Sequence, residues 1–176
     1  MSASNSSKIT RLHLWELALT SHTPYYMSDG KTCDTVTSII LQIDTDRGIS
    51  GFGEVCAIPA YLPAFAGGVQ AALTDSADAL LGQDAIGGGC AMAAFESALK
   101  GHLYVKSAIN MALWDITAKA AKLPLYALLG GRQNDTLPLY HSITCVAPDE
   151  MARIAKEAHA QGIRQFQVKL GADNDW

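Results

Sequence analysis

The sequence predicts an α+β domain followed by the beginning of a parallel α/β domain, with the boundary near Arg132. Two observations support this fold class. Extended runs separated by turns come first, and helical patterns follow them as a block, which is typical of an α+β domain. Further along, residues 137–171 have the pattern of a strand, a helix and a second strand, the order of a βαβ unit with parallel strands.

Composition restricts the class of protein. The chain has 176 residues, of which 49% are hydrophobic and 17% charged, as in soluble globular proteins with a well-formed core. A formal net charge of -4 leaves no basic surface for nucleic acid or for a polybasic membrane contact. No apolar run is long enough to span a bilayer, and residues 1–8 are expected to be a disordered tail and not a secretory signal. We therefore expect a cytoplasmic protein whose partner is a small molecule.

The first part of the chain predicts a small antiparallel meander. Alternating leucines make residues 9–19 strand-like, and further extended runs cover residues 34–45 and 49–54. Asp46-Arg47-Gly48 between the last two runs is a hairpin turn signal. Residues 21–31 are rich in turn formers and are expected to form a loop, although they include two tyrosines. A meander of this size is marginally stable alone, so helices must pack on it.

Helices are predicted at residues 69–81, at 91–100, from Ser107 to the stop at Pro124, and briefly at 125–129. The third is the clearest, because Ser107 is a good N-cap and an apolar stripe runs from Ile109 to Ala120. The run Gly87-Gly88-Gly89 is not a phosphate loop, because it follows a helix and lacks a lysine.

The βαβ unit places a lysine where parallel α/β folds carry their chemistry. Its helix begins at Pro148, with acidic residues in the first turn, and ends at Gly162. Alternation divides the strand that follows into an apolar face and a polar face: Phe166, Val168 and Leu170 on the first, Gln165, Gln167 and Lys169 on the second. Lys169 is thus expected near the carboxyl end of a parallel strand. The polar face and the adjacent Gly171 favour a functional role over the alternative, a solvated surface lysine.

Other candidates for chemistry are weaker. The 5 histidines have no HExxH or similar metal-ligand spacing, and no GxSxG or Ser/His/Asp pattern occurs. Asp115 and Glu54 are isolated acids that we expect to hold loops or helix ends. The 4 cysteines include no CxxC pair, so they are expected to be reduced and mostly buried thiols: Cys33, Cys56, Cys90 and Cys145.

Three stretches follow one another at informative spacings: Ser107–Asp115, Pro124–Gly131 and Gln167–Gly171, preceded by Gly51-Phe52-Gly53-Glu54. In this order they resemble the mandelate racemase/muconate lactonizing enzyme group of the enolase superfamily. The resemblance implies an α+β capping domain at residues 9–131. It also implies that residues 132–176 are the first part of a modified TIM barrel, incomplete in this chain because a full barrel takes about 250 residues.

The resemblance also implies a reaction. In that family a base on the second barrel strand removes the proton α to a carboxylate that Mg²⁺ holds. By position that base is Lys169, the cofactor is Mg²⁺, and the metal ligands are expected beyond Trp176. Many members carry a second lysine two residues before the base, and here that position is Gln167. A free lysine has a pKa of ~10.4 and needs one of roughly 7 to 8 to act as a base at neutral pH, and a neutral amide cannot lower it by charge repulsion.

The family's capping domain closes two loops over the active site, which by position are residues 22–31 and 56–65. The tyrosines in these loops, Tyr25, Tyr26 and Tyr61, are expected to contact the substrate together with Gln167, or else to pack the loops onto the barrel. Aromatic walls suit a cationic or ring-shaped amino acid.

We therefore expect a racemase, epimerase or dehydratase that acts on an amino-acid derivative of proline type, for example a hydroxyproline, and that forms a homo-oligomer. A muconate-type cycloisomerase and a sugar-acid dehydratase are alternatives. A non-catalytic fragment or assembly partner is an alternative of another class.

Overall fold

The computed structural model describes residues 6–27 and 30–170. It divides into two compact units: a first unit of Met1–Leu19 and Thr37–Arg132, and a second unit of Thr20–Val36 and Gln133–Trp176. Sequence analysis places residues 9–131 in one domain, whereas Thr20–Val36 clusters with the later residues. Residues 1–5 of the expected tail lie outside the described residues, and so does Gly171. The expectation of disorder does not hold for Ser7 and Lys8: Ser7 is buried and its N–H donates to Asp84 Oδ1 at 2.9 Å, and the Lys8 N–H donates to Asp46 Oδ1 at 2.8 Å.

The first unit is built on an antiparallel three-stranded sheet in the order β1-β2-β3, which confirms the predicted meander. The strands are β1 (Ile9–Tyr26), β2 (Thr32–Thr45) and β3 (Ser50–Ala57). The loop predicted at residues 21–31 is wrong for most of its length, because β1 continues to Tyr26 and β2 begins at Thr32. Threonine and tyrosine favour extended backbone, and a strand at the edge of the sheet tolerates Pro24.

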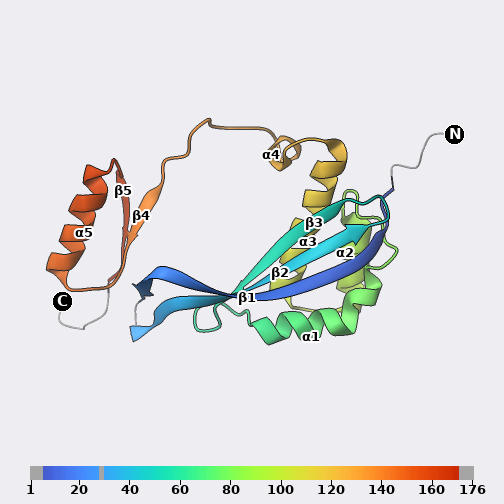
Figure 1. Ribbon diagram of the computed structural model, residues 1–176, viewed down its shortest axis with the longest axis horizontal. Coiled ribbons are helices and arrows are strands. Elements are labelled where there is room, and N and C mark those ends of the chain that lie inside the picture. Colours follow the sequence, from blue (N-terminus) through green and yellow to red (C-terminus); the bar gives the residue numbers. More distant parts are fainter. Residues whose placement is uncertain (1–5, 28–29, 171–176) are drawn as a thin grey trace. The chain divides into compact units, whose positions relative to one another are not determined.

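Helices pack against one face of this sheet (Figure 1). The helices of the first unit are α1 (Ala66–Ser76), the 3₁₀ turn η2 (Ala77–Ala79), α2 (Gly89–Ala98), α3 (Leu103–Ala121) and the short α4 (Leu125–Leu128), which contacts α3. Ile39, Leu41 and Ile43 of β2 alternate with half-buried residues and form the centre of the core. None of the helices in the described ranges has the length and hydropathy needed to cross a bilayer.

Helix α3 begins one turn earlier than Ser107, so the predicted N-cap is wrong. His102, with a φ of 49°, precedes the helix, and its carbonyl oxygen accepts the N–H groups of Val105 and Lys106. The reason is tertiary packing. Val105 is fully buried, so the apolar stripe extends upstream of Ser107, and burial of this residue stabilises an additional helical turn.

Two glycines bring α3 into close contact with β3. A Cβ atom added to Gly53 would lie 1.9 Å from the carbonyl oxygen of Ala108, and one added to Gly51 would lie 2.1 Å from that of Ala112. Both oxygens belong to the backbone of α3. The Gly-Phe-Gly spacing on β3 is therefore a packing requirement, since any larger side chain would push the helix off the sheet.

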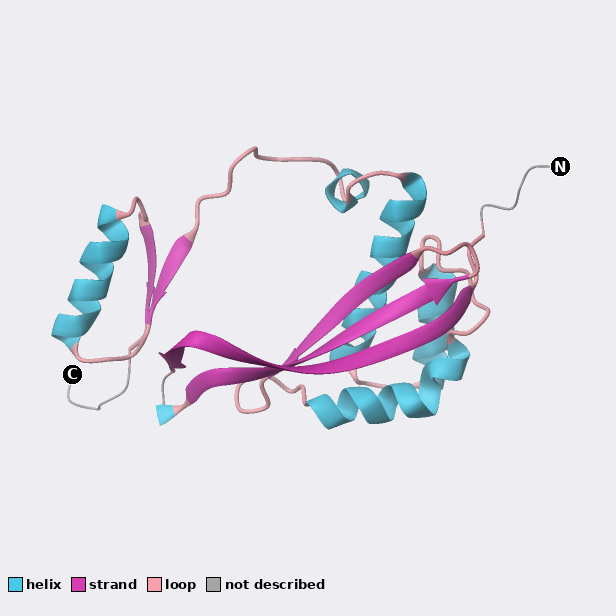
Figure 2. Ribbon diagram, viewed as in Figure 1, coloured by secondary structure: helices cyan, strands magenta, loops and turns pink. Residues whose placement is uncertain are grey.

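The second unit contains the predicted βαβ unit. Strands β4 (Tyr140–Ile143) and β5 (Gln165–Val168) are parallel, and α5 (Pro148–Ala160) connects them and packs against β4 (Figure 2). The parallel pairing is confirmed, although both strands are shorter than predicted. Ile143 and Ala158 are the buried hydrophobic side chains of this unit within the described residues.

Candidate active site

Lys169 lies at the carboxyl end of β5, as the sequence predicts. Its backbone N–H donates a hydrogen bond to the carbonyl oxygen of Ile143, 3.2 Å away, so the parallel pairing extends to Lys169 itself. The residue is half buried. Because Lys169 follows Gln167 by two positions in an extended segment, the two belong to the same face.

A serine that the sequence analysis missed shares this face. The register of β4 and β5 pairs Ser142 with Gln167, and the Ser142 hydroxyl donates to Gln167 Oε1 at 3.3 Å. Ser142 is half buried, whereas Gln167 is exposed. Alternation alone would have assigned Ser142 to one face of β4, but the register that pairs it with Gln167 was not predictable.

The ends of β1 and β2 belong to the same unit as this strand pair. Tyr25 Oη lies 2.6 Å from Ser142 Oγ, which joins the first predicted lid to β4. Tyr26 is joined through its backbone to the residues that follow β4. Its N–H donates to Thr144 Oγ1 at 2.7 Å, and its carbonyl oxygen accepts from Thr144 Oγ1 at 2.9 Å and from the Cys145 N–H at 3.2 Å. The side chain of Tyr26 is 43% exposed.

The structure thus brings Tyr25 and Gln167 together through Ser142, with Lys169 next along the strand. Tyr61 belongs to the first unit, in a turn where its N–H donates to the carbonyl oxygen of Ile58 at 2.9 Å. Its side chain is 65% exposed, so it has little packing role within that unit. Both predicted lid segments therefore carry tyrosines, but the two lids belong to different units.

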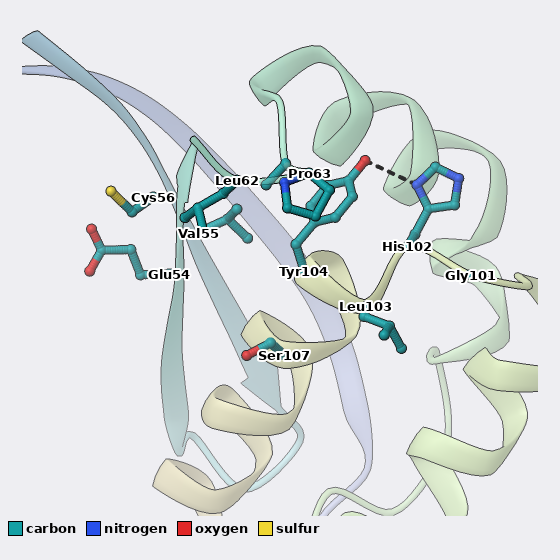
Figure 3. Close-up of a pocket in the computed structure, with 11 residues that line it drawn as sticks. Glu54, Val55, Cys56, Leu62, Pro63, Gly101, His102, Leu103, Tyr104 and Ser107 are labelled. Atoms are coloured by element: carbon teal, nitrogen blue, oxygen red, sulfur yellow. Dashed lines mark hydrogen bonds between the residues drawn. The ribbon is translucent and has the colours of Figure 1, made fainter. Parts of the chain in front are cut away.

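The first unit contains a cavity of about 610 Å³ beside the second predicted lid, residues 56–65 (Figure 3). Its walls are mostly apolar, from Val55, Leu62, Pro63, Ala64 and Leu103. The polar groups come from the two elements that frame it. Glu54 lies on β3 and is hydrogen-bonded to Ser38, and His102 Nδ1 is 3.0 Å from Tyr104 Oη at the start of α3. No lysine or arginine lines the cavity in the described residues, so it offers no cation for a carboxylate.

The isolated acids act as expected of structural residues. Asp115 accepts the backbone N–H of Phe52 at 3.0 Å and pairs with Lys119 at 2.7 Å, which fixes α3 to β3. All four cysteines lie in the described part of the chain and none forms a disulfide. They are not mostly buried as expected, since Cys56 and Cys90 are exposed.

A metal ion needs several donor side chains close together. Among residues 6–27 and 30–170, no group of three or more His, Cys, Asp or Glu side chains could hold a metal ion. The described part of the chain therefore does not supply a ligand set for Mg²⁺. Any such ligands would have to come from residues other than these.

The fold and the motifs place the chain in a family. Residues 9–130 match the model of the mandelate racemase/muconate lactonizing enzyme N-terminal domain. The chain belongs to this family, part of the enolase superfamily, and residues 9–130, with the three-stranded antiparallel sheet and its helices, are the capping domain.

Individual relatives extend the match beyond residue 130. Over 168 residues the chain is 37% identical to cis-3-hydroxy-L-proline dehydratase of Roseibium aggregatum, covering 94% of this chain and 46% of the relative. It is 29% identical to N-succinyl-L-Arg/Lys racemase of Bacillus cereus, covering 94% and 45%. A crystal structure of an enolase-superfamily member from Roseovarius nubinhibens, complexed with magnesium, superposes with a TM-score of 0.86 at 39% identity, covering 96% and 46%. The chain thus spans less than half the length of these relatives.

Proposed function

We propose that this chain is part of an enzyme that removes the proton α to the carboxylate of a small substrate, with Lys169 as the base. The observation that supports the proposal most directly is the position of Lys169. It directly follows a parallel strand, half buried, on the face that also carries Gln167 and Ser142. The carboxyl ends of parallel strands are where α/β barrels bind and transform substrates.

The chemistry requires a base and a stabiliser of charge. The neutral Lys169 amine accepts the α-proton on Nζ, and the electron pair of the broken C–H bond moves toward the carboxylate as an enediolate. Magnesium, which accompanies a related crystal structure, would stabilise that charge in the whole protein. Its ligands are proposed to lie beyond Trp176. Hydrogen-bond donors on the Gln167 face would bind the carboxylate oxygens.

We further propose an amino-acid derivative of proline type as the substrate. The name of the relative at 37% identity supports it, as do the tyrosines at positions 25, 26 and 61, which suit a ring or a cation. The same proton removal leads to two products. A substrate with a hydroxyl on the β-carbon loses it as water after the proton leaves, whereas one without it is reprotonated and epimerised.

The test uses the full-length protein with Mg²⁺ in heavy water. Its intact mass comes first, because a polypeptide about twice this length can hold a complete barrel and one of 176 residues cannot. Cis-3-hydroxy-L-proline, L-proline and N-succinyl amino acids are then assayed for α-deuterium incorporation and for loss of water. A muconate lactone and a sugar acid are included in the panel, and turnover of either would replace the proline-type assignment.

Lys169→Ala should reduce both turnover and α-exchange by at least about 100-fold, the contribution expected of a general base. The matched control is Lys156→Ala, which removes an exposed lysine from α5 and should leave both rates unchanged. Retained exchange from both faces of the α-carbon in the Lys169→Ala variant would refute the assignment of the base.

A further inference from the structure

The hydroxyl of Ser142 occupies a junction between two parts of the second unit. Its Oγ lies 2.6 Å from Tyr25 Oη on β1 and 3.3 Å from Gln167 Oε1 on β5. Tyr25 is 117 positions away in sequence and Gln167 is 25. One atom on β4 therefore links the end of the first predicted lid to the strand that carries Lys169.

Counting protons gives this chain of hydrogen bonds a direction. The oxygen of a glutamine amide can only accept, so the single hydroxyl proton of Ser142 is donated to Gln167 Oε1. Ser142 Oγ must then act as the acceptor for Tyr25, whose hydroxyl is the donor. Tyr25 thus gives its one proton to Ser142 and has none left to donate to a substrate.

The same hydrogen bond sets the orientation of Gln167. With Oε1 bound to Ser142, the end of the amide group that does not face Ser142 is Nε2 with its two N–H donors. Lys169 follows two residues later on the same face. Without Ser142, the amide could rotate by 180° about its last torsion and present an acceptor oxygen, which would repel a carboxylate.

We propose that Ser142 is a positioning residue: it turns the Gln167 amide so that Nε2 donates to a substrate carboxylate, and it holds the end of β1 against β4 through Tyr25. The orientation of Gln167 toward a carboxylate rests on the proposed function. The attachment of β1 to β4 through Tyr25 is independent of the proposed function. The hydroxyl of Tyr25 acts through Ser142 and so has a positioning role.

The first arm of the test is kinetic and uses the full-length protein with Mg²⁺ and cis-3-hydroxy-L-proline. Ser142→Ala should raise KM about tenfold with a smaller change in kcat, because a substrate contact is misoriented while the base is retained. Ser142→Thr keeps the hydroxyl and should restore KM. A KM that stays at the wild-type value in Ser142→Ala would overturn the proposal.

A double-mutant cycle separates positioning from a general structural effect. Gln167→Ala removes the donor itself, so adding Ser142→Ala to it should raise KM no further. Additive effects of the two substitutions would mean that Ser142 does not act through Gln167, and would also overturn the proposal.

The second arm does not depend on activity. Ser142→Ala and Tyr25→Phe each remove one hydrogen bond between β1 and β4, so hydrogen exchange at the Tyr26 and Cys145 amides should accelerate about fivefold. Ser142→Thr should exchange as the wild type does, and amides of the β2–β3 pair should be unaffected in every variant. If wild-type protein shows no α-exchange, the proposed function fails while this arm still decides the attachment of β1. Unchanged exchange at both amides would disprove the attachment.

Discussion

Asp44 on β2 lies among polar side chains from all three strands of the sheet. Ser50 Oγ and Gln42 Nε2 each donate to it at 2.6 Å, and His13 Nε2 lies 3.2 Å away. These bonds favour the charged carboxylate and outweigh partial burial, so they hold the pKa of Asp44 below its usual range. The cluster fixes the outer faces of all three strands to one another.

A depressed pKa makes the stability of this unit depend on pH. The carboxylate contributes its full stabilisation above its unfolded pKa of about 3.9 and loses it as pH falls through the lower folded pKa. Asp44→Asn should therefore lower the free energy of unfolding by about 1 kcal/mol at pH 7. This deficit should shrink below about pH 4, as the wild-type carboxyl also becomes neutral. Urea unfolding from pH 7 to pH 2.5 measures it, with Asp75→Asn on the exposed face of α1 as control. A deficit that is constant over this range would contradict the role given to the charge.

The position of Lys169 at the end of a parallel strand could be predicted from the sequence, whereas the contacts of Ser142 could not. The lysine lies in a segment whose alternation predicts both the strand and the face, and the position after a parallel strand is informative by itself. Ser142 is an ordinary serine until two contacts are known, and both come from residues that are distant in the chain. A long-range register, which single-sequence patterns do not encode, was needed to find it.

At the scale of elements, the close contact of β3 with α3 predicts that a larger residue at Gly53 destabilises the first unit. Gly53→Ala would place a Cβ atom 1.9 Å from the backbone oxygen of Ala108, and helix backbone cannot yield as a flexible side chain does. We expect a loss of about 1–3 kcal/mol or more, as for other overpacked cores. Gly67→Ala on α1 meets nothing within 4 Å and should be neutral, or stabilising by up to about 1 kcal/mol. Thermal unfolding of the two variants makes the comparison. Equal stability would mean that α3 moves freely over β3.

The element boundaries show where local patterns stop being sufficient. The centre of β2 follows its apolar alternation because one face is buried by helices of the same unit. The end of β1 was predicted as a loop because its partners, Thr144 and Cys145, come more than a hundred residues later. Turn-forming residues give a local preference, which contacts from distant residues override.

At the scale of the whole chain, the two units differ in how much apolar surface they bury. Nearly all buried hydrophobic side chains of the described residues belong to the first unit; Ile143 and Ala158 are those of the second. Around β5, Val168 is 49% exposed and Leu170 is 62% exposed. A parallel strand normally has both faces covered, so we expect these apolar residues to be covered in a longer protein, by helices if a barrel forms.

Hydrogen exchange on the chain of residues 1–176 should reveal this difference. Amides of β4 and β5 should exchange at least about 100-fold faster than those of β2 and β3, since local stability follows buried apolar contacts. In a full-length protein with a complete barrel, the amides of β5 should slow toward the β2–β3 values, because both strand faces and the open edge become covered. The β2–β3 amides serve as the internal control, because their core is complete within the first unit. Equal protection of β5 in the two polypeptides would mean that no barrel forms on it, which would favour a non-catalytic assembly role.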